Sequence, residues 1–152
     1  MKTPVPRSYW VRPGSLLAGE YPWRPERFRA AGITAFVDLT VEGEDPPYLD
    51  AIDGWATHAR FPVRDYSIPT VDGMTAILDA IDAALERDVV YVHCLGGSGR
   101  TGTVIGCWLV RHGMGCDEAL ATIAALRRET AYGDKRSPES DEQCDFVRTW
   151  LR

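Results

Sequence analysis

The feature that most constrains the fold is a short apolar run that leads through a glycine-rich segment into an apolar helix. Residues 89–93 read VVYVH, residues 94–100 read CLGGSGR, and residues 101–113 read TGTVIGCWLVRHG. A nearly all-apolar run of this length is typical of a strand buried on both faces of a parallel sheet. A helix that is apolar nearly all round is itself mostly buried. The pattern therefore predicts a central strand, a glycine-rich turn and a buried helix, in that order.

The remaining elements predict an α/β fold, with a central, largely parallel sheet flanked by helices on both faces. Pro25 and Gly32 mark the start and end of a short helix, and Ser137 and Pro138 mark the start of the last one. The other expected elements are strands over 15–20, 33–40 and 56–63, loops over 41–48 and 64–73, and helices from Met74 to Glu86, over 117–129 and over 137–151. Both loops could face a functional site.

Length and composition are those of one globular domain, and we expect a single domain over residues 1–152. The net charge is −5, but residues 1–30 hold six basic and two acidic groups, whereas residues 31–90 hold three and twelve. An acidic chain without a basic stripe argues against a nucleic-acid partner. The sequence shows neither a run of about 18 apolar residues nor a signal peptide, so we expect a cytoplasmic protein with no membrane partner. We also expect a monomer.

Three well-known loop motifs compete for the glycine-rich turn. The run from Gly97 to Gly102 matches the dinucleotide fingerprint G-x-G-x-x-G, but no second strand ending in an acid follows it. A phosphate-binding Walker loop fails because no lysine precedes Thr101. A nucleophile elbow around Ser98 fails because Arg100 stands where its last glycine belongs. None of the three motifs therefore describes this turn.

Cys94 and Arg100 stand at the two ends of the turn with five residues between them. Small residues let consecutive backbone N–H groups point at one anion, and the positive end of the helix dipole adds to the same field. That field favours the thiolate form of a cysteine, which is the nucleophilic form. A planar guanidinium holds two phosphoryl oxygens and follows the charge of the transition state. The spacing predicts a site where Cys94 attacks phosphorus and Arg100 closes over the phosphate.

The run from His93 to Gly102, HCLGGSGRTG, resembles the H-C-x-x-G-x-G-R-[ST]-G signature of the cysteine-dependent protein tyrosine phosphatases. Chain length, motif position and the helices after the motif resemble the compact dual-specificity branch, in a bacterial member. The resemblance implies a phosphocysteine intermediate on Cys94, a hydroxyl of Thr101 that assists the leaving thiolate, a loop-orienting role for His93, no cofactor and no metal. It also implies that phosphate is bound by Leu95, Gly96, Gly97, Ser98, Gly99 and Arg100.

Asp65 is the expected general acid. It lies 29 residues before Cys94 in FPVRDYSIP, which resembles the F-P-x-x-D-x-x-x-P acid loop of dual-specificity relatives. A turn aspartate bonded to its own backbone is the alternative, with Asp72 as the reserve acid. Gln143 resembles a glutamine that positions the hydrolytic water in some relatives, although a solvated helix face explains it as well.

The expected reaction is hydrolysis of phosphotyrosine in a phosphorylated protein or peptide, with phosphoserine and phosphothreonine left open. One alternative is a phosphoinositide or another non-protein phosphomonoester, although lipid-directed relatives often carry lysines in the loop and this loop has none. A second is a module that binds phosphorylated partners without turnover, and a third is a rhodanese-like sulfur transferase. Of the other cysteines, Cys107 could still form a redox pair with Cys94, whereas Cys116 and Cys144 are expected to be inert.

Overall fold

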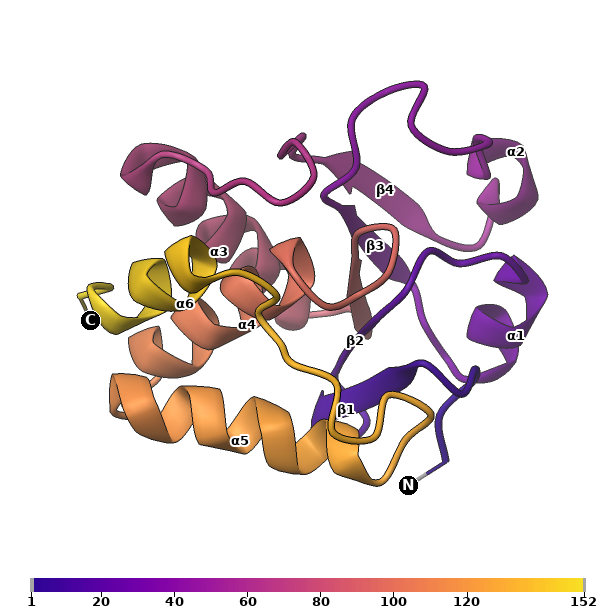
Figure 1. Cartoon of the computed structure of the whole chain (residues 1–152). Coiled ribbons are helices and arrows are strands. Elements are labelled where there is room, and N and C mark those ends of the chain that lie inside the picture. Colours follow the sequence, from indigo (N-terminus) through magenta and orange to yellow (C-terminus); the bar gives the residue numbers. More distant parts are fainter. Residues whose placement is uncertain (1, 152) are drawn as a thin grey trace.

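The computed structural model describes residues 2–151 and contains a five-stranded sheet with helices on both faces (Figure 1). From one edge to the other, the strands are β1 (Ser8–Arg12), β2 (Leu16–Gly19), β5 (Val90–His93), β3 (Ala35–Asp38) and β4 (Thr57–Arg60). β1 pairs with β2 in antiparallel fashion, and all other neighbours are parallel. The predicted α/β class with a largely parallel sheet is confirmed.

The apolar run before the glycine-rich turn forms β5, the middle strand. Val92 pairs with Ala18 of β2 on one side and with Val37 of β3 on the other. Val90 and Val92 pack into the core on one face of the sheet, and Tyr91 packs into the core on the opposite face. Because both faces of β5 are covered, the strand needs apolar residues at successive positions, as its sequence predicts.

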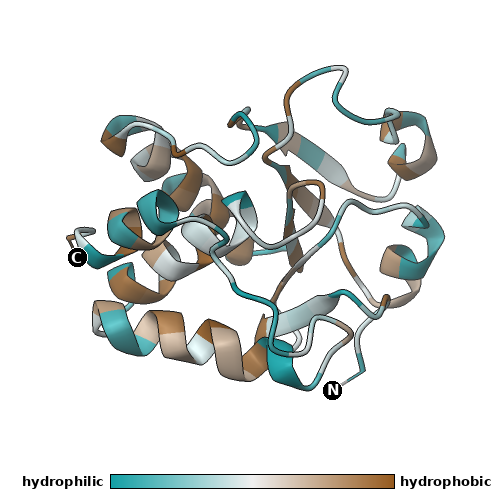
Figure 2. Ribbon diagram, in the orientation of Figure 1, coloured by the Kyte–Doolittle hydropathy of each residue, from teal (hydrophilic) through white to brown (hydrophobic). Residues whose placement is uncertain are grey.

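Helices cover the two faces unequally (Figure 1). One face carries the short helices α1 (Pro25–Ala30) and α2 (Leu49–Ile52), and the other carries α3 (Val71–Leu85), α4 (Arg100–Arg111), α5 (Cys116–Arg128) and α6 (Asp141–Arg148). α4 lies innermost, in contact with α3, α5 and α6, and all but its last residue are buried. In Figure 2 the strand β3 is apolar, whereas the outer helices alternate between apolar and hydrophilic residues, which is typical of amphipathic helices.

Two elements differ from the sequence prediction: β1 was not predicted, and α3 begins earlier than predicted. β1 was not predicted, because its residues lie between prolines that indicate turns, and it is held only at the sheet edge through β2. α3 begins at Val71 rather than Met74, because the Thr70 hydroxyl caps the helix by accepting a hydrogen bond from the Gly73 amide at 2.9 Å. α2 follows the predicted loop 41–48 directly.

The prediction that the last helix starts with Ser137 and Pro138 is wrong. α6 begins at Asp141, and Ser140 caps it by accepting a hydrogen bond from the Gln143 amide at 3.1 Å. The Gln143 side chain in turn accepts a hydrogen bond from the Ser140 amide, so the two residues form a capping box. The helix therefore starts at Ser140, whose hydroxyl accepts from the Gln143 amide while its own amide donates to the Gln143 side chain.

The parallel strands bring four segments to one edge of the sheet. Residues 20–24 follow β2, residues 39–48 follow β3, residues 61–70 follow β4, and residues 94–99 follow β5. Ligands of open α/β sheets commonly bind outside the carboxyl ends of the strands, because connecting loops meet there. The glycine-rich turn lies at the centre of this edge because β5 is the central strand.

Candidate active site

Every backbone carbonyl from residue 94 to residue 99 is engaged on the outside of the glycine-rich turn. The partners, in chain order of the carbonyls, are His93 Nδ1 (3.0 Å), Tyr21 N (2.9 Å), Tyr132 Oη (2.7 Å), Arg127 Nη1 (2.9 Å), Ser137 Oγ (2.6 Å) and Thr103 Oγ1 (2.8 Å). Holding the carbonyls outward leaves amide groups for the inside of the turn. We call residues 94–100 the phosphate loop.

The chain after α4 supplies three of these supports. Arg127 is fully buried, donates to the Gly97 carbonyl and the Ser98 hydroxyl, and lies with its guanidinium carbon 3.7 Å from the centre of the Tyr132 ring. Ser137 donates to the Ser98 carbonyl. Arg127 lies in the predicted helix over 117–129, and its contacts with the loop were not predicted from the sequence. Buried hydrogen-bonded groups of this kind hold a loop in one conformation.

Cys94 lies at the floor of the phosphate loop and is only 3% exposed. Its sulfur accepts hydrogen bonds from the Gly97 amide at 3.2 Å and from the Thr101 hydroxyl at 3.0 Å. Gly99 is the N-cap of α4, so Thr101 lies in the first turn and points its hydroxyl at the sulfur instead of capping the helix. Two donors and a helix N-terminus thus surround the sulfur, an environment that stabilises a thiolate.

Arg100 is buried beside the loop and is held from two neighbouring segments. Its guanidinium donates to both carboxylate oxygens of Glu44, at 2.8 and 2.6 Å, and to the Val63 carbonyl at 2.8 Å. Burial by itself would lower the pKa of Arg100, but the hydrogen bonds to Glu44, together with the negative charges of Cys94, Glu44 and Asp65, raise the pKa above its ordinary value. The buried Nε has no hydrogen-bond partner among the described residues. That N–H is available to a phosphoryl oxygen.

Asp65 reaches the site from the segment after β4, as predicted. Its Oδ1 lies 3.4 Å from Nη2 of Arg100 and also accepts a hydrogen bond from the Tyr66 amide at 3.0 Å. The side chain is 52% exposed. Both predicted arrangements therefore occur together, since Asp65 is near the loop and is also bonded to the next backbone amide. The reserve acid, Asp72, is exposed in the first turn of α3, and no described contact joins it to the loop.

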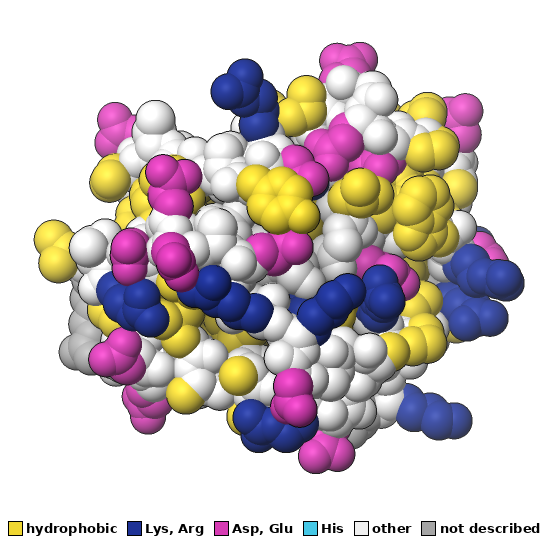
Figure 3. Space-filling view, viewed as in Figure 1, with side chains coloured by type: hydrophobic (Ala, Val, Ile, Leu, Met, Phe, Trp, Pro, Cys, Tyr) yellow, Lys and Arg dark blue, Asp and Glu magenta, His cyan; other side chains and the backbone are white. Residues whose placement is uncertain are grey.

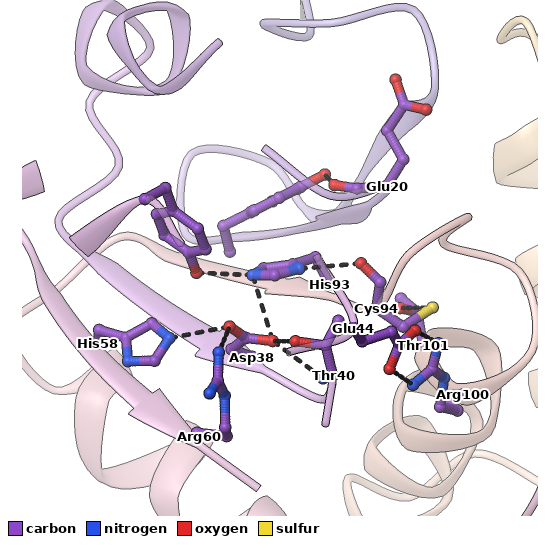
Figure 4. A network of polar contacts seen from close by, with 12 residues as sticks. Glu20, Asp38, Thr40, Glu44, His58, Arg60, His93, Cys94, Arg100 and Thr101 are labelled. Atoms are coloured by element: carbon purple, nitrogen blue, oxygen red, sulfur yellow. Dashed lines mark hydrogen bonds and ion pairs between the residues drawn. The ribbon is translucent and has the colours of Figure 1, made fainter. Parts of the chain in front are cut away.

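His93 connects the phosphate loop to a buried polar network (Figure 4). Its Nδ1 donates to the Cys94 carbonyl, and its Nε2 accepts from the Tyr48 hydroxyl at 2.7 Å when the ring is neutral. Burial lowers the pKa of His93 to about 4. Burial would raise the pKa of nearby Asp38, but hydrogen bonds, led by that from His58 at 2.9 Å, hold it well below its usual range. His93 therefore orients the loop as a neutral ring.

Gln143 is fully buried, so of its two interpretations the solvated helix face is wrong. Its amide nitrogen donates to the Ser67 carbonyl at 3.2 Å, two residues after Asp65. A Cβ atom added at Gly99 would lie 3.0 Å from the Gln143 amide. Gln143 therefore lies between the phosphate loop and the segment that carries Asp65, and its capping bonds to α6 fix its position.

Three further features bear on function: the second cysteine Cys107, groups able to hold a metal ion, and helices able to cross a membrane. Cys107 is buried within α4, and burial raises its pKa above the ordinary range. Cys94 and Cys107 are both free thiols. Across residues 2–151, no group of three or more His, Cys, Asp and Glu side chains is arranged to hold a metal ion. In the same range, no helix is both long and apolar enough to cross a membrane.

Glu44, Tyr132 and Ser137 contact the site but were not predicted from the sequence, and the sequence indicates them to different degrees. Glu44 lies in the acidic loop 41–48, which the sequence analysis placed near a site without choosing among its acids. Tyr132 and Ser137 lie in irregular backbone after α5, and no local pattern indicates that they contact a loop about 35 residues earlier. Only the packing of α5 against α4 and the sheet brings them there.

Comparison with known proteins agrees with this fold and site. A family model described as the Swiss Army Knife protein (PTP-SAK), DSP-PTPase phosphatase domain, matches residues 5–149. The crystal structure of Tk-PTP in the active form has a TM-score of 0.78 and 28% identity, covering 93% of this chain and 94% of that one. The fold and the loop define a protein of the tyrosine and dual-specificity phosphatase class. The chain belongs to the PTP-SAK phosphatase family.

Two curated relatives cover part of the chain. An uncharacterized protein of Methanocaldococcus jannaschii is 47% identical over 97 residues, 60% of this chain and 53% of that protein. Arabidopsis thaliana PTEN1, named a phosphatidylinositol 3,4,5-trisphosphate 3-phosphatase and protein-tyrosine-phosphatase, is 34% identical over 77 residues, 49% of this chain and 19% of that protein. The chain spans about half the length of the first curated relatives it matches. These two come from an archaeon and a plant, and a bacterial source stays a prediction.

Proposed function

We propose that this protein hydrolyses phosphotyrosine in proteins or peptides through a phosphocysteine intermediate on Cys94. The observation that carries the proposal is the position of the Cys94 sulfur, which accepts two hydrogen bonds at the floor of a loop whose carbonyls are all engaged outward. Membership of the phosphatase family and the fold shared with Tk-PTP support it. Phosphoserine and phosphothreonine are further substrates of the same chemistry.

In the first step, the Cys94 thiolate attacks phosphorus and an S–P bond forms while the P–O bond to the leaving group breaks. Asp65, as a carboxylic acid, donates its proton to the departing oxygen. The loop amides and the guanidinium of Arg100 hold the equatorial oxygens, on which negative charge develops in the transition state. Glu44 fixes the guanidinium in a bidentate contact, so less conformational freedom is lost when phosphate binds.

In the second step, a water molecule attacks phosphorus and the Asp65 carboxylate accepts one of its protons. The S–P bond breaks, inorganic phosphate forms, and Cys94 leaves as a thiolate. The Thr101 hydroxyl, which donates to the sulfur at 3.0 Å, and the Gly97 amide stabilise the charge that returns to it. Gln143, between the loop and the Ser67 carbonyl, is positioned to orient that water.

Phosphoinositide hydrolysis is the second candidate, and one observation favours it. Arabidopsis PTEN1 carries a lipid phosphatase name and shares 34% identity over 77 residues with this chain. The phosphate loop has no lysine, so it offers no second cation to an inositol ring that carries more than one phosphate. We therefore rank it below protein phosphatase activity, and rank a binding module without turnover lower still.

The wider context of the activity is also a proposal. The four cysteines without a C-x-x-C pair support a reducing compartment such as the cytoplasm, and we propose that the 152 residues act as one phosphatase domain and as a monomer. Size-exclusion chromatography with light scattering tests the oligomeric state. A dimer at micromolar concentration would contradict it.

Phosphate release from three substrates tests the proposed function. We expect the wild-type protein to release phosphate from a phosphotyrosine peptide faster than from a matched phosphothreonine peptide or from a phosphatidylinositol monophosphate, at an equal rate with and without EDTA. Faster release from the lipid would support the second candidate instead. Activity that depends on added divalent metal, or no release from any substrate, would contradict the proposal.

A further inference from the structure

Two adjoining pockets lie between the N-terminal segment and α1, and Arg27 lines both. The pocket nearer the phosphate loop has a volume of about 170 Å³, and its lining includes Glu20, Trp23 and Arg24. The other has a volume of about 320 Å³, and its lining includes Lys2. We call the two pockets together the α1 groove. The α1 groove occupies the part of the chain where the sequence concentrates positive charge, with six basic and two acidic residues in the first 30.

The α1 groove begins beside the phosphate loop. The Tyr21 amide, at the near end of the groove, donates to the Leu95 carbonyl at 2.9 Å, and the Trp23 amide donates to the Tyr21 carbonyl at 2.8 Å. Since consecutive Cα atoms are about 3.8 Å apart, Trp23 lies within about 8 Å of Tyr21. Leu95 and Gly96 are the accessible residues of the loop on this side. A peptide with its phosphotyrosine in the loop reaches the groove within a few residues.

The cations of the α1 groove have no carboxylate partners. Lys2, Arg24 and Arg27 are exposed, and none of them forms an ion pair within residues 2–151. Some exposed arginines elsewhere do pair, such as Arg136 with Asp141 at 2.6 Å, whereas others, such as Arg87, do not. In Figure 3, Lys and Arg side chains gather over α1 and continue as a band toward the middle of the face. Unpaired cations beside a pocket attract and orient a ligand of opposite charge.

Trp23 adds an apolar contact to these charges. Its side chain is 55% exposed, and its ring lies 4.6 Å from the ring of Tyr21. Tryptophan and arginine are both enriched among the residues that contribute most to binding in protein interfaces. Glu20 is the one carboxylate among the residues that line the groove, and the positive charge of Arg7 attracts it. The groove is therefore positively charged with an apolar contact at its inner end.

We propose that the α1 groove binds an acidic segment next to the phosphotyrosine of the substrate, with Arg24 and Arg27 facing its carboxylates and Trp23 packing against a neighbouring side chain. This inference rests on the proposed function. The cations lie along a groove that leads away from the loop, whereas a polyphosphorylated headgroup would need cations at the loop itself, where Leu95, Gly96 and Ser98 stand. Residues 31–90, with twelve acidic and three basic groups, repel an extended anionic surface.

Charge reversal at two positions tests the inference. The substrates are a phosphotyrosine peptide with glutamates beside the phosphotyrosine, the same peptide with glutamines there, and p-nitrophenyl phosphate. We expect the wild-type protein to prefer the glutamate peptide several-fold in kcat/KM. The double variant Arg24→Glu/Arg27→Glu should lower kcat/KM for that peptide about tenfold, since two exposed charge pairs change from attraction to repulsion. The other two substrates should change less than about twofold.

Arg87→Glu is the matched control. Arg87 is exposed, forms no ion pair with the described residues, and lies just before β5, at the end of the sheet opposite the phosphate loop. Reversing this single charge, half the change made in the double variant, should leave all three substrates within about twofold of wild type. An equal loss in this control would show a general field effect and overturn the assignment to the groove.

Binding to a phosphopeptide separates the inference from turnover. In a Cys94→Ser background, the labelled glutamate peptide should bind about tenfold more weakly when Arg24 and Arg27 are reversed, as measured by fluorescence anisotropy. Equal affinity for the glutamate and glutamine peptides would overturn the inference. So would a charge reversal that weakens binding to phosphoinositide vesicles but not to the glutamate peptide. Hydrolysis of p-nitrophenyl phosphate by the wild type reports the proposed function separately, so either claim can fail while the other stands.

Discussion

The phosphate loop and the segment that carries Asp65 face each other across the site and are held very differently. In the phosphate loop, all six carbonyls from residue 94 to residue 99 have partners, and Cys94 is 3% exposed. In the segment 61–70, Asp65 is 52% exposed and Tyr66 is 63% exposed. Tyr66 also has a φ of 61°, the left-handed conformation that a residue with a side chain seldom adopts.

This difference matches the two chemical tasks. Stabilising a phosphoryl group requires donors that are in place before the substrate arrives, because reorganisation during the reaction would reduce the stabilisation. Delivering a proton to substrates of different shape requires a group that approaches after binding, and loops with few buried contacts open and close most readily. Among the described residues, three side-chain contacts connect the Asp65 segment to the residues around the phosphate: Ser67 with Gln143, Val63 with Arg100, and Asp65 itself with Arg100. The two segments therefore suit the roles proposed for them, a preorganised anion site and an acid whose position can adjust.

The largest expected effect comes from changing Cys94, the nucleophile in the phosphate loop. Cys94→Ser should lower kcat by about 10⁴-fold or more, because a hydroxyl replaces the thiolate that forms the covalent intermediate. Vanadate or phosphate should still bind within about tenfold, since the amides and Arg100 are unchanged. Steady-state kinetics and isothermal titration calorimetry measure the two quantities. A variant that keeps more than about a tenth of the wild-type kcat would contradict covalent catalysis.

In the segment 61–70, Asp65→Asn tests the proton donor by comparing substrates with different leaving groups. Phosphotyrosine peptide hydrolysis should slow by about 10²–10⁴-fold, the usual scale of general acid catalysis. Hydrolysis of p-nitrophenyl phosphate should slow considerably less, because its leaving group is a weak base and needs little protonation. Asp72→Asn is the matched control and should change neither rate. Equal losses on both substrates would show that Asp65 is structural.

Much of the fold was predictable from local patterns, and part of the site was not. The apolar run 89–93 predicts the central strand because a strand covered on both faces needs apolar residues at successive positions. Cys94, Arg100 and Asp65 were predicted as site residues because their spacing follows the chemistry of one reaction, and the structure brings Asp65 within 3.4 Å of Arg100. Arg127, Tyr132 and Glu44 were missed because their partners lie about 30 to 56 residues away.

A smaller effect concerns His93, which supports the phosphate loop as a neutral ring. Burial lowers the pKa of His93 from 6.5 to about 4, so between these pH values the unfolded chain binds a proton that the folded protein excludes. The free energy of unfolding should therefore fall as the pH falls from 6.5 to 4, by about 3 kcal/mol from this group. Urea denaturation at several pH values measures it. In His93→Asn, this part of the pH dependence should disappear. An unchanged slope would contradict the assignment.

The smallest expected effect comes from removing one tyrosine hydroxyl, either beside the phosphate loop or in the Asp65 segment. The Tyr132 hydroxyl donates to the Gly96 carbonyl at 2.7 Å, so Tyr132→Phe leaves that carbonyl without its partner. We expect a loss of about 1 kcal/mol of stability and a several-fold lower kcat. Tyr66→Phe is the matched change in the Asp65 segment and should change stability by less than about 0.5 kcal/mol, because Tyr66 is exposed. Equal effects of the two substitutions would remove the difference between the two segments.

Trapping the intermediate tests the central claim most directly. The claim is that the phosphoryl group passes from the substrate to Cys94 and only afterwards from Cys94 to water. Rapid acid quench of wild-type protein during turnover of a phosphotyrosine peptide, followed by proteolysis and mass spectrometry, should show one phosphoryl group on the peptide that contains Cys94. Cys94→Ser should show none at that position under the same conditions. Phosphate release at the full wild-type rate without any phosphorylated Cys94, or with the phosphoryl group on another residue, would contradict the account.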